Sequence, residues 1–236
     1  MSLGGEELSL LVRVVPLAIG AAFTPSLFAI QVLTTAGPHW VSRSLAVALG
    51  SASAFFIACS LLFFGFTQLP HHQASEPNPV GGVIWMLAAA VLLGAAIWLF
   101  WPHLQLAQAV EKNLTQKIER ARWYTFFGVA FALSIKDITS FALIVPALHE
   151  TASSGLGFLF QLGTCLIVFA LALFPVLLPP LWRALRGKAA NRDLGAIYRV
   201  TMDHQFSIVG VIATLFCLYC LAMSLGPYGF GVYGIG

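Results

Sequence analysis

Long apolar runs alternate with short polar connectors along the chain. Within each run the apolar residues are continuous, which is typical of membrane-spanning helices, whereas the strands of a membrane barrel alternate apolar and polar positions. A helix needs about 20 such residues to cross the hydrocarbon core. The pattern predicts an all-α integral membrane protein with six transmembrane segments, at residues 10–35, 44–67, 82–101, 123–148, 156–181 and 206–226.

The composition agrees with this class of protein. Of the 236 residues, 59% are hydrophobic and 9% are charged, and the mean hydropathy is +0.88, whereas soluble domains carry about 25% charged residues. We therefore expect a single transmembrane domain over residues 1–236 that interacts with membrane lipids. No glycine-rich phosphate loop or Ser/His/Asp arrangement is present in the sequence, so we expect neither an enzyme nor a cofactor.

The basic residues indicate how the segments are oriented. Ten of the twelve Lys and Arg lie in the connectors after the first, third and fifth segments, and Arg13 and Lys136 are the other two. Short loops rich in Lys and Arg stay in the cytoplasm. The sequence thus predicts a multi-pass protein of the plasma (inner) membrane with both termini on the extracytoplasmic side. The net charge of +3 reports this topology and does not indicate nucleic-acid binding.

The connectors differ in character. Residues 103–122 place apolar side chains on one helical stripe and most charges opposite, which predicts a helix at the cytoplasmic interface. The segment 149–155 reads as a short turn, 182–205 as a polar, basic connector, and the glycine-rich 227–236 as a flexible tail. Small-residue stripes in the second and third segments permit close contact within one chain or between two, so a homodimer is one predicted state.

The two halves of the chain resemble each other, as in transporters built from inverted repeats. Phe23-Thr24-Pro25 in the first segment can be aligned with Leu133-Ser134-Ile135 in the fourth. Three helices per half is an odd number, so the second half must be inverted. We predict a 3+3 inverted repeat, with repeat A at about 10–101 and repeat B at about 123–226.

Both first helices of the repeats carry an element that disturbs a helix. Pro25 removes one backbone hydrogen bond in the middle of its segment, so the helix should kink or break near Thr24 and free carbonyl groups for a ligand. Polar residues at the matching place in the fourth segment predict a similar disturbance there. A kink that is merely packed inside the protein is the alternative.

Lys136 and Asp137 are adjacent opposite charges in an apolar run. Lys136 lies roughly 20 Å from either end of its segment at about 1.5 Å per residue, and a charge at such a depth costs about 2.5–3.5 kcal/mol or more. We expect it to face a wet cavity or a partner, on a stripe with Gly128, Ala132 and Ser140. Lys136 could hold an anionic group while Asp137 carries a coupling proton; a buried structural ion pair is the alternative.

Three stretches resemble the lysine-exporter superfamily, and most nearly its peptidoglycolipid-addressing (GAP) group: VVPLAIGAAFTPSLFAIQVL at 14–33, ALSIKD at 132–137 and MDHQFSIVGVIATLF at 202–216. That group carries an Asn-Pro-Lys-Asn signature where this chain has Ser134, Ile135, Lys136 and Asp137, so only the lysine is kept. The resemblance implies an exporter or a lipid-export accessory protein. It also implies a gating or interfacial role for His204, next to Asp203.

We therefore expect a secondary transporter that exports a small amphipathic or lipid-like substrate with an anionic group, by alternating access at the two breaks. The predicted substrate site contains residues from the first and fourth segments: Thr24, Pro25, Ser26, Ser134, Lys136, Asp137 and Ser140. A membrane subunit that assists envelope lipid export without transporting is the main alternative.

Two other hypotheses concern a membrane thiol-disulfide relay and a metal site. AFTPSLFAI also looks like the Pro-Cys segment of membrane thiol-disulfide relays, but Ser26 follows the proline, so the chain would be a relative that has lost its cysteines. Cys217 and Cys220 are spaced like a redox pair but lie in an apolar run, where cysteine packs as a small hydrophobe. We predict no metal site, although five residues expected on the outer face could gather around an ion: His71, His72, Glu76, His149 and Glu150.

Overall fold

The computed structural model describes residues 4–37, 39–68, 79–100 and 122–226, and all of the regular elements in these ranges are helices. The first half contains α1 (Gly5–Ala21), α2 (Pro25–Ala36), α3 (Trp40–Phe66) and α4 (Pro79–Phe100). The second half contains α6 (Trp123–Lys136), α7 (Ile138–Ser153), α8 (Phe158–Arg186), a short 3₁₀ turn (Gly187–Ala189), α9 (Ala190–Asp203) and α10 (Gln205–Leu225). The predicted interfacial helix at 103–122 and the glycine-rich tail lie outside the described residues, apart from Arg122.

Four helices, α3, α4, α8 and α10, are long and apolar enough to cross a membrane. The other two predicted segments are each a pair of helices joined at a sharp bend, of 59° between α1 and α2 and 65° between α6 and α7. The described chain thus has four spans, or six if each bent pair is one span. Both predicted helix breaks are present.

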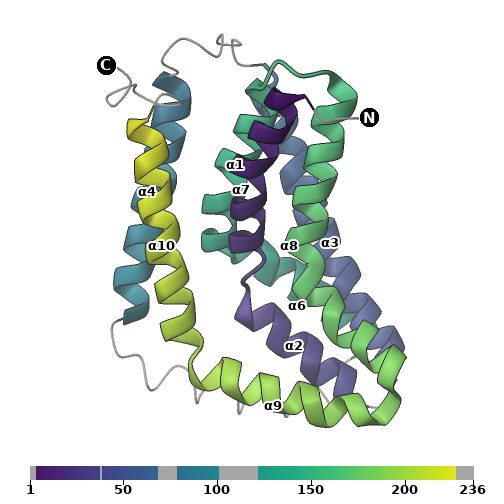
Figure 1. The fold of residues 1–236 in the computed structure, drawn as a ribbon. Coiled ribbons are helices and arrows are strands. Elements are labelled where there is room, and N and C mark those ends of the chain that lie inside the picture. The colour runs from purple at the N-terminus through teal and green to yellow at the C-terminus, as the bar shows by residue number, and fades with distance from the viewer. Residues whose placement is uncertain (1–3, 38, 69–78, 101–121, 227–236) are drawn as a thin grey trace.

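The chain passes up and down between two ends of the molecule, and the start of α1 and the end of α10 lie at the same end (Figure 1). The α1/α2 and α6/α7 pairs run in opposite directions, and α9 lies across the opposite end. At each bend one helix ends and the next begins, so four helix ends lie near the centre of the molecule. α8 packs along both helices of the first pair, and α3 packs along both helices of the second.

Small residues set the closest helix contact. Gly50 of α3 packs on the backbone of α6, where a Cβ atom would collide with the carbonyl oxygen of Phe127. Ala46 and Ala54, one turn before and after Gly50, are also buried. This is the small-residue stripe expected in the second segment, and it brings two helix backbones together as such stripes do in membranes.

The main apolar core lies between α1, α3, α4, α7, α8 and α10. Trp85 and Phe55 are its largest fully buried side chains. Cys217 and Cys220 pack into the same core as small apolar groups. α4 and α10 pack chiefly against each other and form a hairpin-like pair beside the other helices (Figure 1).

One prediction about a connector was wrong, and a second connector has structure that the sequence did not predict. Residues 149–153 are the last turn of α7 rather than a turn between helices, and His149 and Glu150 are buried. The connector at 182–205 is helical through most of its length, because α8 continues to Arg186 and α9 follows. α9 buries Ala190 and Leu194 against Val32 of α2 and turns its charged residues outward, so its helix depends on this packing.

Candidate substrate site at the two helix breaks

The two breaks meet through the residues that begin the second helix of each bent pair. Thr24 is the N-cap of α2 and Asp137 is the N-cap of α7. The Thr24 hydroxyl donates a hydrogen bond of 2.6 Å to Oδ2 of Asp137. The counterpart of Thr24 in the second pair is therefore Asp137, three residues after the Ser134 with which the sequence aligned it.

Asp137 is held by donors from both pairs. Besides Thr24, its carboxylate accepts from the hydroxyl of Thr139 at 2.7 Å and from the backbone N–H of Ser140 at 3.2 Å. The Ser140 hydroxyl lies 2.6 Å from Oδ2. N-capping bonds satisfy backbone amides that have no partner within the first turn of a helix. Asp137 therefore marks the end of α6 and caps the start of α7, and its bond with Thr24 joins both helices to the other break.

Ser140 replaces a hydrogen bond that Pro25 removes. In a continuous helix the Ala21 carbonyl would accept from the N–H of residue 25, and proline has none. The Ser140 hydroxyl lies 2.7 Å from that carbonyl oxygen. Its one proton cannot serve both the Ala21 carbonyl and Asp137.

The first turn of α2 is left without a side-chain cap. Thr24 occupies the N-cap position but makes no cap hydrogen bond, since its hydroxyl points to Asp137. Ser26, on the first turn, is exposed. Its side chain makes no hydrogen bond to any described residue, so the predicted role of that hydroxyl in the cluster is not supported. Its position at an uncapped helix N-terminus favours anions.

Lys136 and Ser134 stand apart from the hydrogen-bonded cluster. Lys136, the last residue of α6, is exposed and forms neither an ion pair nor a hydrogen bond with any described residue. Ser134 is fully buried, and its hydroxyl has no hydrogen-bond partner in the described part of the chain. A buried hydroxyl of this kind costs free energy unless something binds it.

The predicted stripe of Gly128, Ala132, Lys136 and Ser140 does not continue across the break. The first three lie on the exposed side of α6, whereas the bend at Asp137 turns Ser140 into the buried cluster. Asp203 and His204 lie at the junction of α9 and α10 and are exposed. His204 contacts the Val200 carbonyl within its own turn at 3.3 Å, so the structure does not bring these two residues to the breaks.

The family model of Sap, the sulfolipid-1-addressing protein (SfLAP), matches residues 14–226, which include both breaks and every residue of the predicted site. The chain belongs to the sulfolipid-1-addressing protein family. No curated protein and no solved structure matches this chain. The geometry of the two breaks in this family member is therefore read from its own structure.

Sequence reasoning missed a second polar cluster in this sulfolipid-1-addressing protein family member. Arg13 of α1 and Glu150 of α7 form an ion pair of 3.3 Å, with 18% and 9% of the two side chains exposed. The indole N–H of Trp85 in α4 donates to Glu150 at 3.1 Å. Arg13 and Glu150 are lone charges within or beside apolar runs, and the need of each for an opposite charge was the available signal.

A residue of α10 also takes part in this cluster. Tyr219 of α10 donates its hydroxyl to the Arg13 carbonyl oxygen at 3.3 Å, and its ring meets Trp85 edge-on at 5.9 Å between centroids. Glu150 is thus engaged by an arginine and a tryptophan and is buried inside the protein. Its predicted partners in a metal cluster, His71, His72 and Glu76, lie outside the described residues.

Proposed function

We propose that this chain is a secondary transporter that exports an anionic lipid-like molecule, by alternating access around the two helix breaks. The observation that carries the proposal is the hydrogen bond between Thr24 and Asp137, which ties the N-caps of two half-helices together at the bends. Broken helices that meet in this way are how many transporters build a binding site inside the membrane.

The polar groups around the breaks fit an anion. α2 presents an uncapped N-terminus, Lys136 supplies a cation without a partner among the described residues, and the hydroxyl of Ser134 is buried and unpartnered. We propose that Lys136 binds the anionic group of the substrate. The family match supports a lipid as the carrier of that group, because the name of the family refers to addressing a sulfolipid.

Asp137 is the proposed coupling residue. A proton on Oδ2 would let Ser140 donate to the Ala21 carbonyl and so repair the break beside Pro25, whereas an ionised Asp137 competes for the same hydroxyl. Protonation also leaves the charge of Lys136 uncompensated, which favours binding of an anion. One proton would thereby link substrate binding to the hydrogen bonding of the α1/α2 bend.

The remaining parts of the proposal concern the whole chain. The opposite directions of the two bent pairs support a 3+3 inverted repeat, in line with the resemblance to the lysine-exporter superfamily. The basic connectors support a plasma-membrane protein with both termini on the extracytoplasmic side. We propose transport and not enzymatic chemistry.

Transport can be tested in vesicles that contain the purified full-length chain and a trace of lipid labelled on its acyl chain. The probes are a sulfated glycolipid, phosphatidylglycerol and phosphatidylcholine, and the readout is movement of each between leaflets, with and without a pH gradient. We expect faster movement of the acidic probes than in empty vesicles. Asp137→Asn and Lys136→Met should slow it by about ten-fold or more, because a hydrogen bond to a charged group contributes about 1.5–3 kcal/mol.

Glu6→Gln is the matched control, since it makes the same carboxylate-to-amide change at an exposed position of α1. It should move lipid at the wild-type rate. If wild type moves none of the probes and none of them raises its melting temperature, the proposal fails. The alternative, a subunit of a lipid-export pathway that does not itself transport, would then be favoured by the capping role of Asp137, which such a subunit also needs.

A further inference from the structure

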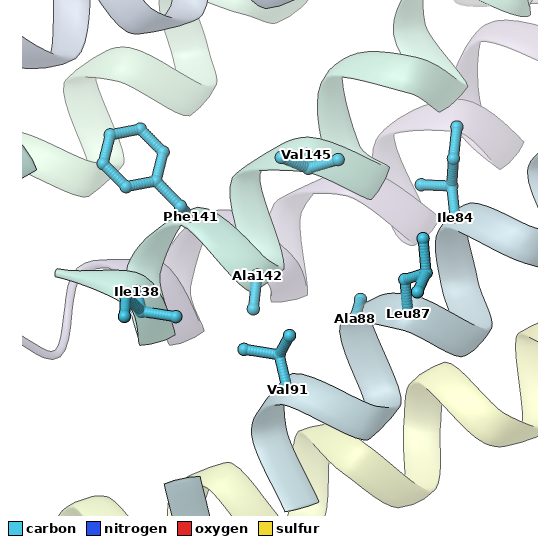
Figure 2. Close-up of a pocket in the computed structure, with 8 residues that line it drawn as sticks. All are labelled: Ile84, Leu87, Ala88, Val91, Ile138, Phe141, Ala142 and Val145. Atoms are coloured by element: carbon cyan, nitrogen blue, oxygen red, sulfur yellow. The ribbon is translucent and has the colours of Figure 1, made fainter. Parts of the chain in front are cut away.

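A narrow apolar groove runs between α4 and α7 and ends at the second helix break. Its volume is about 260 Å³. Figure 2 shows Val91 beside Ile138 and Ala142 at one end, and Ile84 beside Val145 at the other. Since Ile138 directly follows Asp137, the groove begins one residue from the proposed site.

The two walls have the same residue spacing. α4 contributes Ile84, Ala88 and Val91, and α7 contributes Ile138, Ala142 and Val145. These positions lie on one helical face, with an alanine at the centre of each wall. Both alanines are buried, at 5% and 8% exposure, whereas Ile138 and Leu87 on the rim are exposed at 66% and 61%. The groove therefore has a floor of small residues and a rim that faces outward.

The size of the groove and its apolar lining indicate which kind of molecule it can hold. Each wall spans seven residues, or about 10 Å of helix, and all of the lining side chains are apolar. A second helix, about 10–12 Å across, is too wide to enter a groove of about 260 Å³. A polar molecule would find no hydrogen-bonding side chain there. A single acyl chain satisfies both limits.

The charge of Lys136 indicates which class of lipid supplies that acyl chain. Lys136, exposed and without an ion-pair partner among the described residues, lies two residues before Ile138 at the same end of the groove. The opposite end leads along α7 toward the end of the molecule where α1 begins and α10 ends. A lipid with its head at Lys136 and one chain along the groove would be attracted by charge as well as by apolar contact.

We propose that the groove between α4 and α7 holds one acyl chain of an acidic lipid whose headgroup lies at the α6/α7 break beside Lys136. This inference rests on the proposed function and adds to it the place of the chain. Substrate would reach the breaks sideways from the bilayer, sliding between the two helices. The chain would stay among apolar side chains while the headgroup is at the centre of the membrane.

Photocrosslinking of the full-length chain in lipid nanodiscs tests the proposal. A benzophenone amino acid replaces Leu87 on the groove rim or, as a control, Leu93, which is exposed elsewhere on α4. The nanodiscs contain phosphatidylglycerol or phosphatidylcholine with the same clickable acyl chain. We expect position 87 to capture the acidic lipid about five-fold more, the effect of one lysine on an anionic lipid. Position 93 should capture both lipids equally.

Two further variants separate the headgroup from the groove. Lys136→Met should abolish the preference at position 87 without lowering capture of phosphatidylcholine. Ala88→Leu, which fills the floor, should lower capture at position 87 several-fold, whereas Ala90→Leu on the exposed side of the same helix should not. The melting temperatures of the variants show whether each is folded.

Equal capture of the two lipids at position 87 would identify an ordinary bilayer lipid and overturn the proposal. Absence of capture there, or capture that Ala88→Leu leaves unchanged, would also overturn it. The result is separable from the transport test. If transport depends on Lys136 and Asp137 but position 87 has no preference, only the groove assignment fails; with the preference present and no transport, the groove remains and the transporter proposal fails.

Discussion

Asp137 joins two helix breaks that are 113 residues apart in the chain, through its bond with Thr24. It also caps α7, so one carboxylate fixes a local helix start and a distant contact at once. Because Thr24 gives its hydroxyl to Asp137 and leaves α2 uncapped, the two residues depend on each other more than ordinary neighbours do. The contribution of the Thr24–Asp137 contact to stability can therefore be measured as a coupling free energy.

We expect Thr24→Val and Asp137→Asn to be non-additive in the free energy of unfolding, with a coupling of about 0.5–3 kcal/mol, as found for residues in one hydrogen-bonded network. The measurement is a double-mutant cycle by reversible unfolding in detergent. Thr24→Val combined with Glu6→Gln is the control cycle, which should add to within about 0.3–0.5 kcal/mol. Additivity of Thr24 and Asp137 would show that their contact contributes nothing to the fold.

At the scale of single residues, the sequence drew attention to polar residues near the two breaks but not to the contacts between them. Lys136 and Asp137 stand out because charge is rare in such a run, and Pro25 because it removes a hydrogen bond. Thr24 could not be predicted as a partner, since it meets Asp137 only through tertiary packing, whereas the contact of Asp137 with Ser140 is a local capping contact. For the same reason Glu150 looked like a turn residue, although Arg13 buries it.

At the scale of helices, small residues have opposite roles on α3 and α4. Gly50 lets α3 approach the α6 backbone, and any Cβ there meets the Phe127 carbonyl, which cannot move without distorting α6. Gly94 of α4, part of the stripe that also contains Ala90, has no described atom within 4 Å of such a Cβ. The two glycines are thus a matched pair of one packed and one open position.

Gly50→Ala should lower the free energy of unfolding by about 1–3 kcal/mol, the cost of overpacking a tight contact. Gly94→Ala should leave it unchanged or raise it by about 0.4–1 kcal/mol, because alanine restricts the unfolded chain. Unfolding in detergent, followed by circular dichroism, measures both. If Gly50→Ala were as stable as wild type, the close approach of α3 and α6 would be wrong.

Helix ends were predictable where one residue imposes them and not where packing does. Proline at position 25 forces the first bend whatever surrounds it. The second bend has no proline and depends on the side chain of Asp137 accepting from Ser140. α9 was not predicted, although its sequence carried a helical signal: Ala190, Leu194, Ile197 and Tyr198 recur at helical spacing. Its basic residues were interpreted only as a sign of the cytoplasmic side.

At the scale of the whole molecule, the Arg13–Glu150 cluster links the α4/α10 pair to α1 and α7. Trp85 and Tyr219 come from that pair, and the charges they contact come from the two bent helices. The apolar groove lies along the same α4/α7 contact, on the side toward the breaks. A lipid that moves between α4 and α7 would therefore pass beside the Arg13–Glu150 cluster. This cluster joins α4 and α7 at the ends that lie away from the breaks.

Glu150→Gln should lower the free energy of unfolding by about 3–5 kcal/mol, because the amide can still accept from Trp85 but leaves the Arg13 charge buried without a carboxylate. Arg13→Met alone should cost a similar amount for the opposite reason. The double variant, Arg13→Met with Glu150→Gln, should be more stable than either single one, since no buried charge remains. If instead the two costs simply add, the ion pair between Arg13 and Glu150 contributes nothing to the fold.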